Sequence, residues 1–243
     1  MASIVIYTDG ACLGNPGPGG WGAIVRLADG TVVELGGGES STTNNRMELV
    51  ACLEGIRYAR SKGVTKEPVE VLADSKYVLE GISKWIHGWK QKNWITKNSE
   101  EVKNRDLWEA LDRSAGEMNI TWTHVEGHAG IPGNERCDEI SVQFAEGSEP
   151  YLYDGPATEY SIDLNQREPN PAKLKAKQNR KSSSKPKGPG TFYLSYVGGK
   201  VYRDPTWPLC EARVKGHRGA KYKKCGSADE EREILTSWGV KDA

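Results

Sequence analysis

The stretch that decides the fold is SIVIYTDGAC, residues 3–12. It begins as a run of β-branched and aromatic residues, which predicts a buried strand. An acidic residue, Asp9, follows this run directly. Because an unpaired carboxylate is costly to place at the end of a buried strand, Asp9 is a candidate functional residue.

Three other acidic residues lie in comparable settings. Asp74 closes a second apolar run, VEVLA at residues 69–73, and Glu48 and Asp138 lie near the starts of two predicted helices. One site can therefore collect all four carboxylates. Such a cluster is strongly unfavourable, through like-charge repulsion and desolvation, unless a cation lies within it. The pattern predicts a site for divalent metal ions.

The composition is that of a globular protein. The chain has 243 residues, 37% of them hydrophobic, which suffices for one ordinary domain and a smaller one. No apolar run approaches the roughly 20 residues that cross a bilayer, and the N-terminus lacks a secretory pattern, so we expect a cytoplasmic location. The five cysteines are widely spaced and form no CxxC pair, which argues against a disulfide framework and against a structural zinc site.

The first 147 residues alternate between strand and helix signals. Strands are predicted at residues 3–12, 20–28, 31–37, 69–73 and 119–124, and helices at 42–62, 75–94, 103–116 and 132–146. Short turns join the first three strands, and helices separate the later ones. This order predicts an α/β domain over residues 1–147, with a mixed five-stranded sheet flanked by helices.

Periodicity disappears from Ser148 to Gly190. This segment is rich in proline, serine and lysine, and residues 169–190 hold seven basic residues and no acidic one. These features predict a linker over residues 148–190 that is disordered in its second half. Strand and helix signals resume afterwards and predict a small α+β module over residues 191–239.

Five motifs of the first 147 residues resemble type 1 ribonuclease H in order and spacing. They are TDGACLGNPG (8–17), TNNRMEL (43–49), DS (74–75), GHAG (127–130) and NERCD (134–138). The resemblance implies a ribonuclease H-like fold and an endonuclease that hydrolyses the RNA strand of RNA–DNA hybrids. It also implies that two magnesium ions, for which manganese can substitute, are bound by Asp9, Glu48, Asp74 and Asp138.

The chemistry of the reaction favours the same residues independently. In two-metal hydrolysis of a phosphodiester, one ion generates the nucleophile and the other stabilises the departing oxygen. Carboxylates are the hard ligands that magnesium prefers. The alternative is that these residues are ordinary strand-end and helix-terminal charges. That alternative is reasonable for any one of them and poor for four within one motif set.

His128 lies in a loop between two glycines, Gly127 and Gly130. Such a loop lets a side chain that titrates near neutral pH approach a site and leave it again. The resemblance assigns His128 an auxiliary catalytic role in proton transfer or product release.

The resemblance also places a set of residues against the hybrid. Those toward the RNA are Gly10, Ala11, Cys12, Asn15 and Asn44, and those toward the DNA strand are Thr43 and Asn45. RNA is distinguished by its 2′-hydroxyl groups, which require donors and acceptors close to the backbone. Lys76 departs from the family, which frequently has glutamine there, and a lysine can contact a phosphate instead. The segment 84–94 mixes lysines with three tryptophans and resembles the family's basic protrusion, with Trp85 facing substrate. In the alternative, these tryptophans form a local core.

The C-terminal module carries a recurring set of aromatic, small and basic residues: Phe192-Tyr193, Trp207, Cys210, Val214, Gly216, Gly219-Ala220 and Tyr222-Lys223-Lys224. This pattern resembles the hybrid-binding domain usually found at the N-terminus of eukaryotic type 1 enzymes. Residues 191–225 hold eight basic and two acidic residues, which suits a polyanionic ligand. The resemblance implies contacts to RNA from Tyr193, Lys223 and Lys224, and stacking on the DNA strand by Trp207 and Tyr222. The alternative is that the three aromatic residues build the core of the module.

Two rival functions are a hybrid-binding protein without activity and a transposase-like DNA nuclease. The acidic cluster argues against the first, because a pure binder gains nothing from repulsive carboxylates. The Asn44–Asn45 pair and the C-terminal module argue against the second. We expect the RNA–DNA hybrid as the partner, with no membrane and no obligate protein partner.

Overall fold

The computed structural model describes residues 4–116, 118–175, 192–217, 219–226 and 228–240. The chain divides into two compact units, residues 1–175 and 176–243. All five cysteines are free thiols, as the sequence predicts. Within the part of the chain that the structure describes, no helix combines the length and apolarity needed to cross a membrane.

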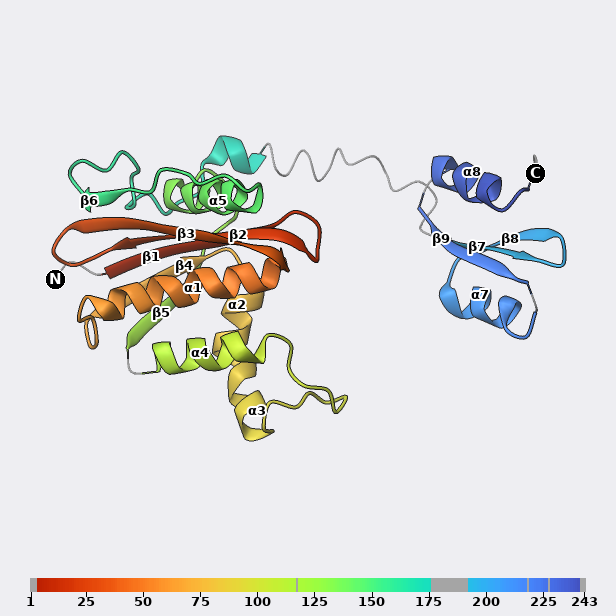
Figure 1. Cartoon of the computed structure of the whole chain (residues 1–243), viewed down its shortest axis with the longest axis horizontal. Coiled ribbons are helices and arrows are strands. Elements are labelled where there is room, and N and C mark those ends of the chain that lie inside the picture. Colours follow the sequence, from red (N-terminus) through yellow and green to blue (C-terminus); the bar gives the residue numbers. More distant parts are fainter. Residues whose placement is uncertain (1–3, 117, 176–191, 218, 227, 241–243) are drawn as a thin grey trace. The chain divides into compact units, whose positions relative to one another are not determined.

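A mixed sheet forms the centre of the larger unit (Figure 1). Its strands are β1 (Ile4–Cys12), β2 (Gly17–Arg26), β3 (Thr31–Thr42), β4 (Pro68–Ala73), β5 (Asn119–His124) and β6 (Asp154–Pro156), in the order β5-β4-β1-β2-β3-β6. β1 pairs antiparallel with β2 and parallel with β4, and β5 continues the parallel part. The predicted mixed sheet is therefore confirmed, but it has six strands instead of five. The added strand, β6, pairs antiparallel with β3 at the edge of the sheet.

Helices cover both faces of this sheet. They are α1 (Asn44–Ser61), α2 (Lys76–Glu80), α3 (Ile86–Gln91), α4 (Arg105–Ala115) and α5 (Pro132–Ala145), with a π-helical turn, η1 (Gly81–Trp85), between α2 and α3. α1 lies on one face and α5 on the other, and α4 packs against α1 (Figure 1). This arrangement explains why β1 is apolar almost throughout, since both of its faces are buried.

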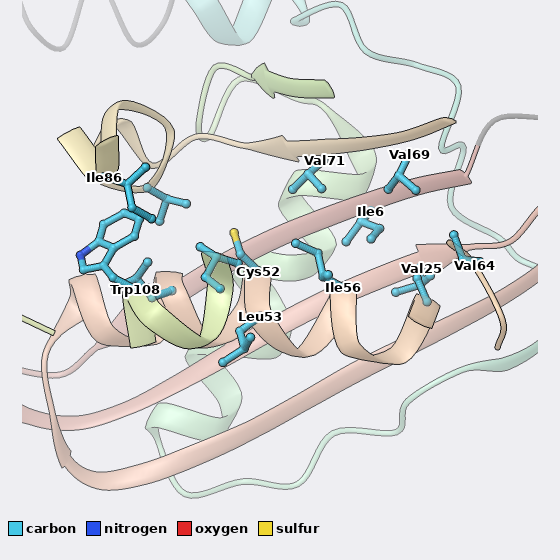
Figure 2. Close-up of a cluster of buried hydrophobic side chains, with 14 of the residues drawn as sticks. Ile6, Val25, Cys52, Leu53, Ile56, Val64, Val69, Val71, Ile86 and Trp108 are labelled. Carbon is cyan, nitrogen blue, oxygen red and sulfur yellow. The ribbon is translucent and has the colours of Figure 1, made fainter. Parts of the chain in front are cut away.

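The main hydrophobic core lies between the sheet and α1 (Figure 2). Cys52 and Ile56 of α1 recur at helical spacing and meet Ile6 and Val71 of the sheet. Trp108 of α4 closes one end of this core and is fully buried. The amphipathic helix predicted after residue 42 is thus the element that covers the sheet.

The opposite face is covered partly by residues 150–175, which we call the strap. Leu164 is buried against Val5, Tyr7 and Leu72 of the sheet. The Tyr7 hydroxyl donates to the carbonyl oxygen of Leu164 at 3.1 Å, and burial raises the pKa of Tyr7 to about 12. The strap therefore completes the second core of the larger unit.

A buried carboxylate, Glu34 of β3, fixes the middle of the strap. Arg136 of α5 donates to both of its oxygens at 2.8 and 2.9 Å. Tyr160 donates its hydroxyl at 2.6 Å, and the backbone N–H of Tyr153 donates at 3.1 Å. These bonds outweigh the effect of burial and lower the pKa of Glu34. An ion pair between Arg167 and Glu70 fastens the strap further along.

Residues 148–175 of the predicted linker over residues 148–190 belong to the larger unit, and residues 176–190 lie outside the described residues. The sequence pattern did not predict this attachment. The physical reason is that the strap is held by single anchors, among them Tyr160 and Leu164, with no repeating apolar pattern.

The smaller unit is a three-stranded antiparallel sheet with two helices, in agreement with the predicted α+β module. Its elements are β7 (Phe192–Val197), β8 (Lys200–Asp204), α7 (Trp207–Val214), β9 (Lys221–Cys225) and α8 (Ala228–Ser237), with strand order β8-β7-β9. Its small core contains Leu194, Cys225 and Ile234. A core of this size leaves several aromatic side chains outside it.

Candidate active site

Strand register brings two of the predicted carboxylates together. β1 and β4 are parallel, and Thr8 lies opposite Ala73, so the next residues, Asp9 and Asp74, lie side by side. Glu48 approaches from the second turn of α1. Ligand oxygens of these three residues all lie within 4.8 Å of one another. The three carboxylates therefore form the compact cluster that the sequence predicts.

Gly10 permits this approach of α1 to β1. A Cβ atom at Gly10 would lie 2.3 Å from the backbone nitrogen of Glu48, which no side chain tolerates. The glycine of the TDG motif thus brings Glu48 next to Asp9. Gly10 also donates its N–H to Asp9 Oδ1 at 2.8 Å.

The cluster is buried and incompletely hydrogen-bonded. Asp9 and Glu48 are each 6% exposed. Asn44 Nδ2 donates to Glu48 Oε1 at 3.3 Å, whereas Glu48 Oε2 is buried and has no hydrogen-bond partner among the described residues. A buried carboxylate oxygen without a donor is costly unless a cation approaches it. The donor set therefore fits a hard divalent cation.

The carboxylate of Asp74 contacts Gly127 and Asn134, which the sequence did not identify as its neighbours. A Cβ atom at Gly127 would lie 2.1 Å from Asp74 Oδ2. Asn134, which is 1% exposed, donates from Nδ2 to the same oxygen at 3.4 Å. A sequence signal for Asn134 existed, because it precedes Asp138 by four residues and so shares its face of α5.

Asp138 and His128 form the outer part of the site. Asp138 lies outside the group of three, but its carboxylate interacts with those of Asp9 and Asp74. His128 Nδ1 lies 3.4 Å from Asp138 Oδ2, and the His128 side chain is 71% exposed. The structure thus brings all five predicted catalytic residues into one neighbourhood, with His128 on its solvent side.

Burial and mutual repulsion shift the acidities of the cluster. Burial, followed by Asp74 and Asp138, raises the pKa of Asp9 to about 8. Burial, followed by Asp9 and Asp74, raises the pKa of Glu48 well above its usual range, and burial raises the pKa of Asp138. Without a cation the cluster therefore retains protons near neutral pH, and a bound cation would displace them.

We predict that the metal-free protein loses stability as pH rises from about 4 to about 8. In this window the folded state binds more protons than the unfolded state, because the folded pKa of Asp9 is raised, so the free energy of unfolding falls by a few kcal/mol. Urea unfolding at pH 5 and pH 8 in chelator measures this loss, and magnesium should reverse it at pH 8. The Asp9→Asn variant is the control and should show a smaller pH dependence; an equal dependence in both proteins would contradict the assignment.

The predicted RNA-side and DNA-side residues form a rim beside the cluster. Pairing of Gly17 with Thr42 holds the turn after β1 next to the start of α1. Cys12 Sγ lies 3.5 Å from the carbonyl oxygens of both residues and can donate its single S–H to either of them. Asn15 and Asn45 are exposed on this rim. Thr43 is the N-cap residue of α1, and the side chain of Asn44 is turned toward Glu48.

The tryptophan-rich segment divides its residues between packing and exposure. Trp85 is half-buried, and its ring lies 6.0 Å from that of Tyr77 and 5.7 Å from that of Trp89. Its lysines, Lys84, Lys90, Lys92 and Lys97, are exposed, as is Lys76 at the start of α2. The alternative of a local aromatic core is thus supported for the tryptophans.

Three aromatic side chains of the smaller unit lie in a row. The ring of Trp207 lies 5.5 Å from that of Tyr193 and 5.1 Å from that of Tyr222, which is 54% exposed. Tyr193 pairs with Lys224 across the sheet, so Lys224 lies on the same face as the row. Lys223 pairs with the buried Leu194, and the register therefore puts it on the opposite face.

Comparisons with known proteins cover the larger unit. Residues 1–146 match the family model described as RNase H. The chain is similar to the ribonuclease H of Rhizobium meliloti (strain 1021), with 51% identity over 153 residues, 62% of this chain and 94% of the relative. It is also similar to the ribonuclease H of Cyanothece sp. (strain PCC 7425 / ATCC 29141), with 48% identity over 147 residues, 60% of this chain and 92% of the relative. Among solved structures, LC9-RNase H1, a type 1 RNase H with the type 2 active-site motif, has a TM-score of 0.57 and 31% identity over 68% of this chain and 84% of that chain.

Proposed function

The chain belongs to the ribonuclease H family over residues 1–146, and from this premise we propose that it is an endoribonuclease acting on the RNA strand of RNA–DNA hybrids. The observation that carries this proposal is the cluster of Asp9, Glu48 and Asp74, whose oxygens lie within 4.8 Å of one another. An acidic cluster this buried has no structural use that offsets its repulsion.

Asp9, Glu48 and Asp74 would hold the metal ions, and Asp138 would complete the set from α5. Two magnesium ions, or manganese in their place, would supply activation of the attacking water and stabilisation of the departing 3′ oxygen. The protein itself fixes the positions of the ligands. Gly10 binds Asp9 through its N–H, Asn44 orients Glu48, and Asn134 orients Asp74.

His128 would serve proton transfer to the leaving group or release of the product. Its exposed imidazole lies 3.4 Å from Asp138, on the solvent side of the cluster where substrate must arrive. It is therefore placed to act on the reacting groups without being a ligand in the buried cluster.

We predict that His128→Ala slows turnover by about 10- to 1000-fold without eliminating it, as expected for a group that assists proton transfer. Single-turnover and steady-state rates on one short hybrid measure the effect and separate chemistry from product release. His124→Ala is the matched control, because His124 ends β5 and has no role in the proposal. Complete loss of activity, or no change, would require a different role for His128.

Recognition of the hybrid would use the rim of the site. Main-chain and side-chain groups of Gly10, Ala11, Cys12, Asn15 and Asn44 would contact 2′-hydroxyl groups, which distinguish RNA from DNA. Thr43, Asn45, Lys76 and Trp85 would lie toward the DNA strand and its phosphates. The half-burial of Trp85 would limit it to an edge contact, and the exposed lysines of the same segment would make the phosphate contacts.

We further propose that residues 191–239 form a hybrid-binding module tethered to the catalytic unit. The row of Tyr193, Trp207 and Tyr222, with Lys224 on the same face, supports this role. Tyr222 is exposed and Tyr193 and Trp207 are half-buried, so the accessible parts of these rings would stack on sugars and bases, and Lys224 would bind phosphate. Lys223 would reach the backbone from the edge of β9. The core alternative is less favourable, because the core consists of Leu194, Cys225 and Ile234.

One experiment tests the proposed activity directly. Strand-labelled RNA–DNA hybrid, duplex RNA and duplex DNA are incubated with the full chain in magnesium, in manganese and in chelator. We expect cleavage of the RNA strand of the hybrid alone, and only with metal. Cleavage of duplex DNA would support the transposase-like alternative, and binding without cleavage would support the inactive hybrid-binding alternative.

A further inference from the structure

The strap ends on the loop that carries His128. The backbone N–H of Asn170 donates to the carbonyl oxygen of Ala129 at 2.7 Å. Gln166 Nε2 donates to the carbonyl oxygen of Gly130 at 3.3 Å. The two residues that follow His128 are therefore both bonded to a segment about 40 positions further along the chain.

A carboxylate of α5 links the same loop to the strap a third time. Glu135 Oε1 accepts the N–H of Gly130 at 3.0 Å. Lys173 Nζ donates to the two oxygens of Glu135 at 2.7 and 2.8 Å. Lys173 therefore orients the Glu135 carboxylate, which accepts the hydrogen bond from Gly130.

Gly130 is shaped for this contact. It has a φ of +83°, and a Cβ atom there would lie 2.6 Å from Asn170 Cβ and 3.1 Å from Lys173 Cδ. Any other residue would push the strap away from the loop. The close approach is therefore specific to a glycine at this position.

The loop itself needs support from outside. His128 has a φ of 50°, in the left-handed region, which is uncommon for residues other than glycine. Such a conformation persists only when the surrounding structure enforces it. The bonds to Ala129 and Gly130 hold the two residues that follow His128 and so limit the directions in which the His128 side chain can leave the backbone.

We propose that the strap is a positioning element for His128, with Gln166, Asn170 and Lys173 as the positioning residues. This inference rests on the proposed function, in which His128 assists the reaction. The ion pair of Lys173 with Glu135 is half-exposed, with 51% and 32% of the side chains accessible. Exposed pairs of this kind contribute little to stability, so its effect on turnover is separable from an effect on folding.

The test is the double variant Gln166→Ala/Lys173→Ala in the full chain, made with His128 present and with His128→Ala. With His128 present, we expect kcat to fall by about 10-fold and KM to stay within about twofold, because the loop is misplaced and the substrate rim is intact. In the His128→Ala background the same pair should have no further effect, since coupled residues are non-additive. The single variant Lys173→Arg, with Gln166 intact, should keep the bond to Glu135 and the kcat of the native chain.

Two further measurements separate positioning from general stability. Hydrogen exchange of residues 128–131 should accelerate in the double variant, while the thermal midpoint shifts by only about 2 °C. Tyr153→Phe is the matched control, because it removes a strap hydrogen bond to Pro156 (2.7 Å) far along the chain from the loop. It should change neither the exchange rates of the loop nor kcat.

Each outcome decides the inference. Equal losses of kcat with and without His128, or unchanged exchange of the loop together with unchanged kcat, would overturn it. If His128→Ala itself has no effect, the proposed role of His128 fails and the inference fails with it. If no hybrid is cleaved under any condition, the proposed function fails, and the exchange rates alone then decide whether the strap holds the loop.

Discussion

Replacing Asp9 with asparagine is expected to abolish metal-dependent cleavage, with a loss on the order of 10³-fold or more, while hybrid affinity stays within about threefold. Asp9 is a buried member of the cluster that interacts with Asp74, Asp138 and Glu48. An amide retains the shape of the side chain but loses the charge that attracts a cation. The substitution leaves the residues proposed to contact the hybrid unchanged, so binding and chemistry should separate.

Three measurements check this result: cleavage rate in magnesium, hybrid affinity in calcium or chelator, and unfolding in chelator. The variant should be more stable than the native chain at pH 8 in chelator, because one buried repulsive charge is gone. Asp154→Asn, an exposed aspartate of β6, is the control and should leave all three unchanged. Near-normal turnover of Asp9→Asn would remove the basis for the metal assignment.

The second large expected effect is a loss of stability when the chain is truncated before the strap. A protein ending after Gly147 loses the strap, and with it the burial of Leu164 and the bond of Tyr160 to Glu34. Burial of the leucine and the tyrosine contributes about 2 kcal/mol each, and a hydrogen bond to a charged group about 2 kcal/mol. The conformational entropy lost on ordering the strap offsets much of this sum of about 6 kcal/mol. We therefore expect the protein ending after Gly147 to be less stable than the one ending after Lys175 by about 1 to 3 kcal/mol, which lowers its thermal midpoint.

A protein ending after Lys175 keeps the strap and should keep the fold and the cleavage rate. What it loses is the smaller unit, so its affinity for long hybrids and its processivity should fall, while short hybrids that cannot occupy both units are cleaved equally well. Circular dichroism melts and cleavage of long and short hybrids at two salt concentrations compare both truncations with the full chain. Equal stability of the two truncations would contradict the role of the strap, and equal activity of the Lys175 protein and the full chain on long hybrids would contradict the tether.

Features with a local sequence signal were predicted correctly, and features that depend on distant partners were not. The first strand and Asp9 were predictable, because a continuous apolar run followed by a carboxylate is a local pattern. Burial of Leu164 was not, because the strap has no period and each anchor depends on a distant partner. Asn134 was accessible through its spacing from Asp138 on one helix face. Lys223 and Lys224 lie on opposite faces of the sheet, as the two-residue period of a strand requires. The family resemblance alone did not distinguish the two faces.

The attachment of the strap has a mechanical consequence. The described part of the larger unit ends at Lys175, and the contacts met in order from that end are the exposed pair of Lys173 with Glu135, the bond of Asn170 to Ala129, the ion pair of Arg167 with Glu70, the bond of Gln166 to Gly130, and then the buried Leu164. Tension applied at this end therefore acts first on the weakest contacts and last on the core. A pull transmitted along the chain would separate the strap from the His128 loop before it unfolds the sheet, so force applied at Lys175 would change the position that we propose the strap gives to His128.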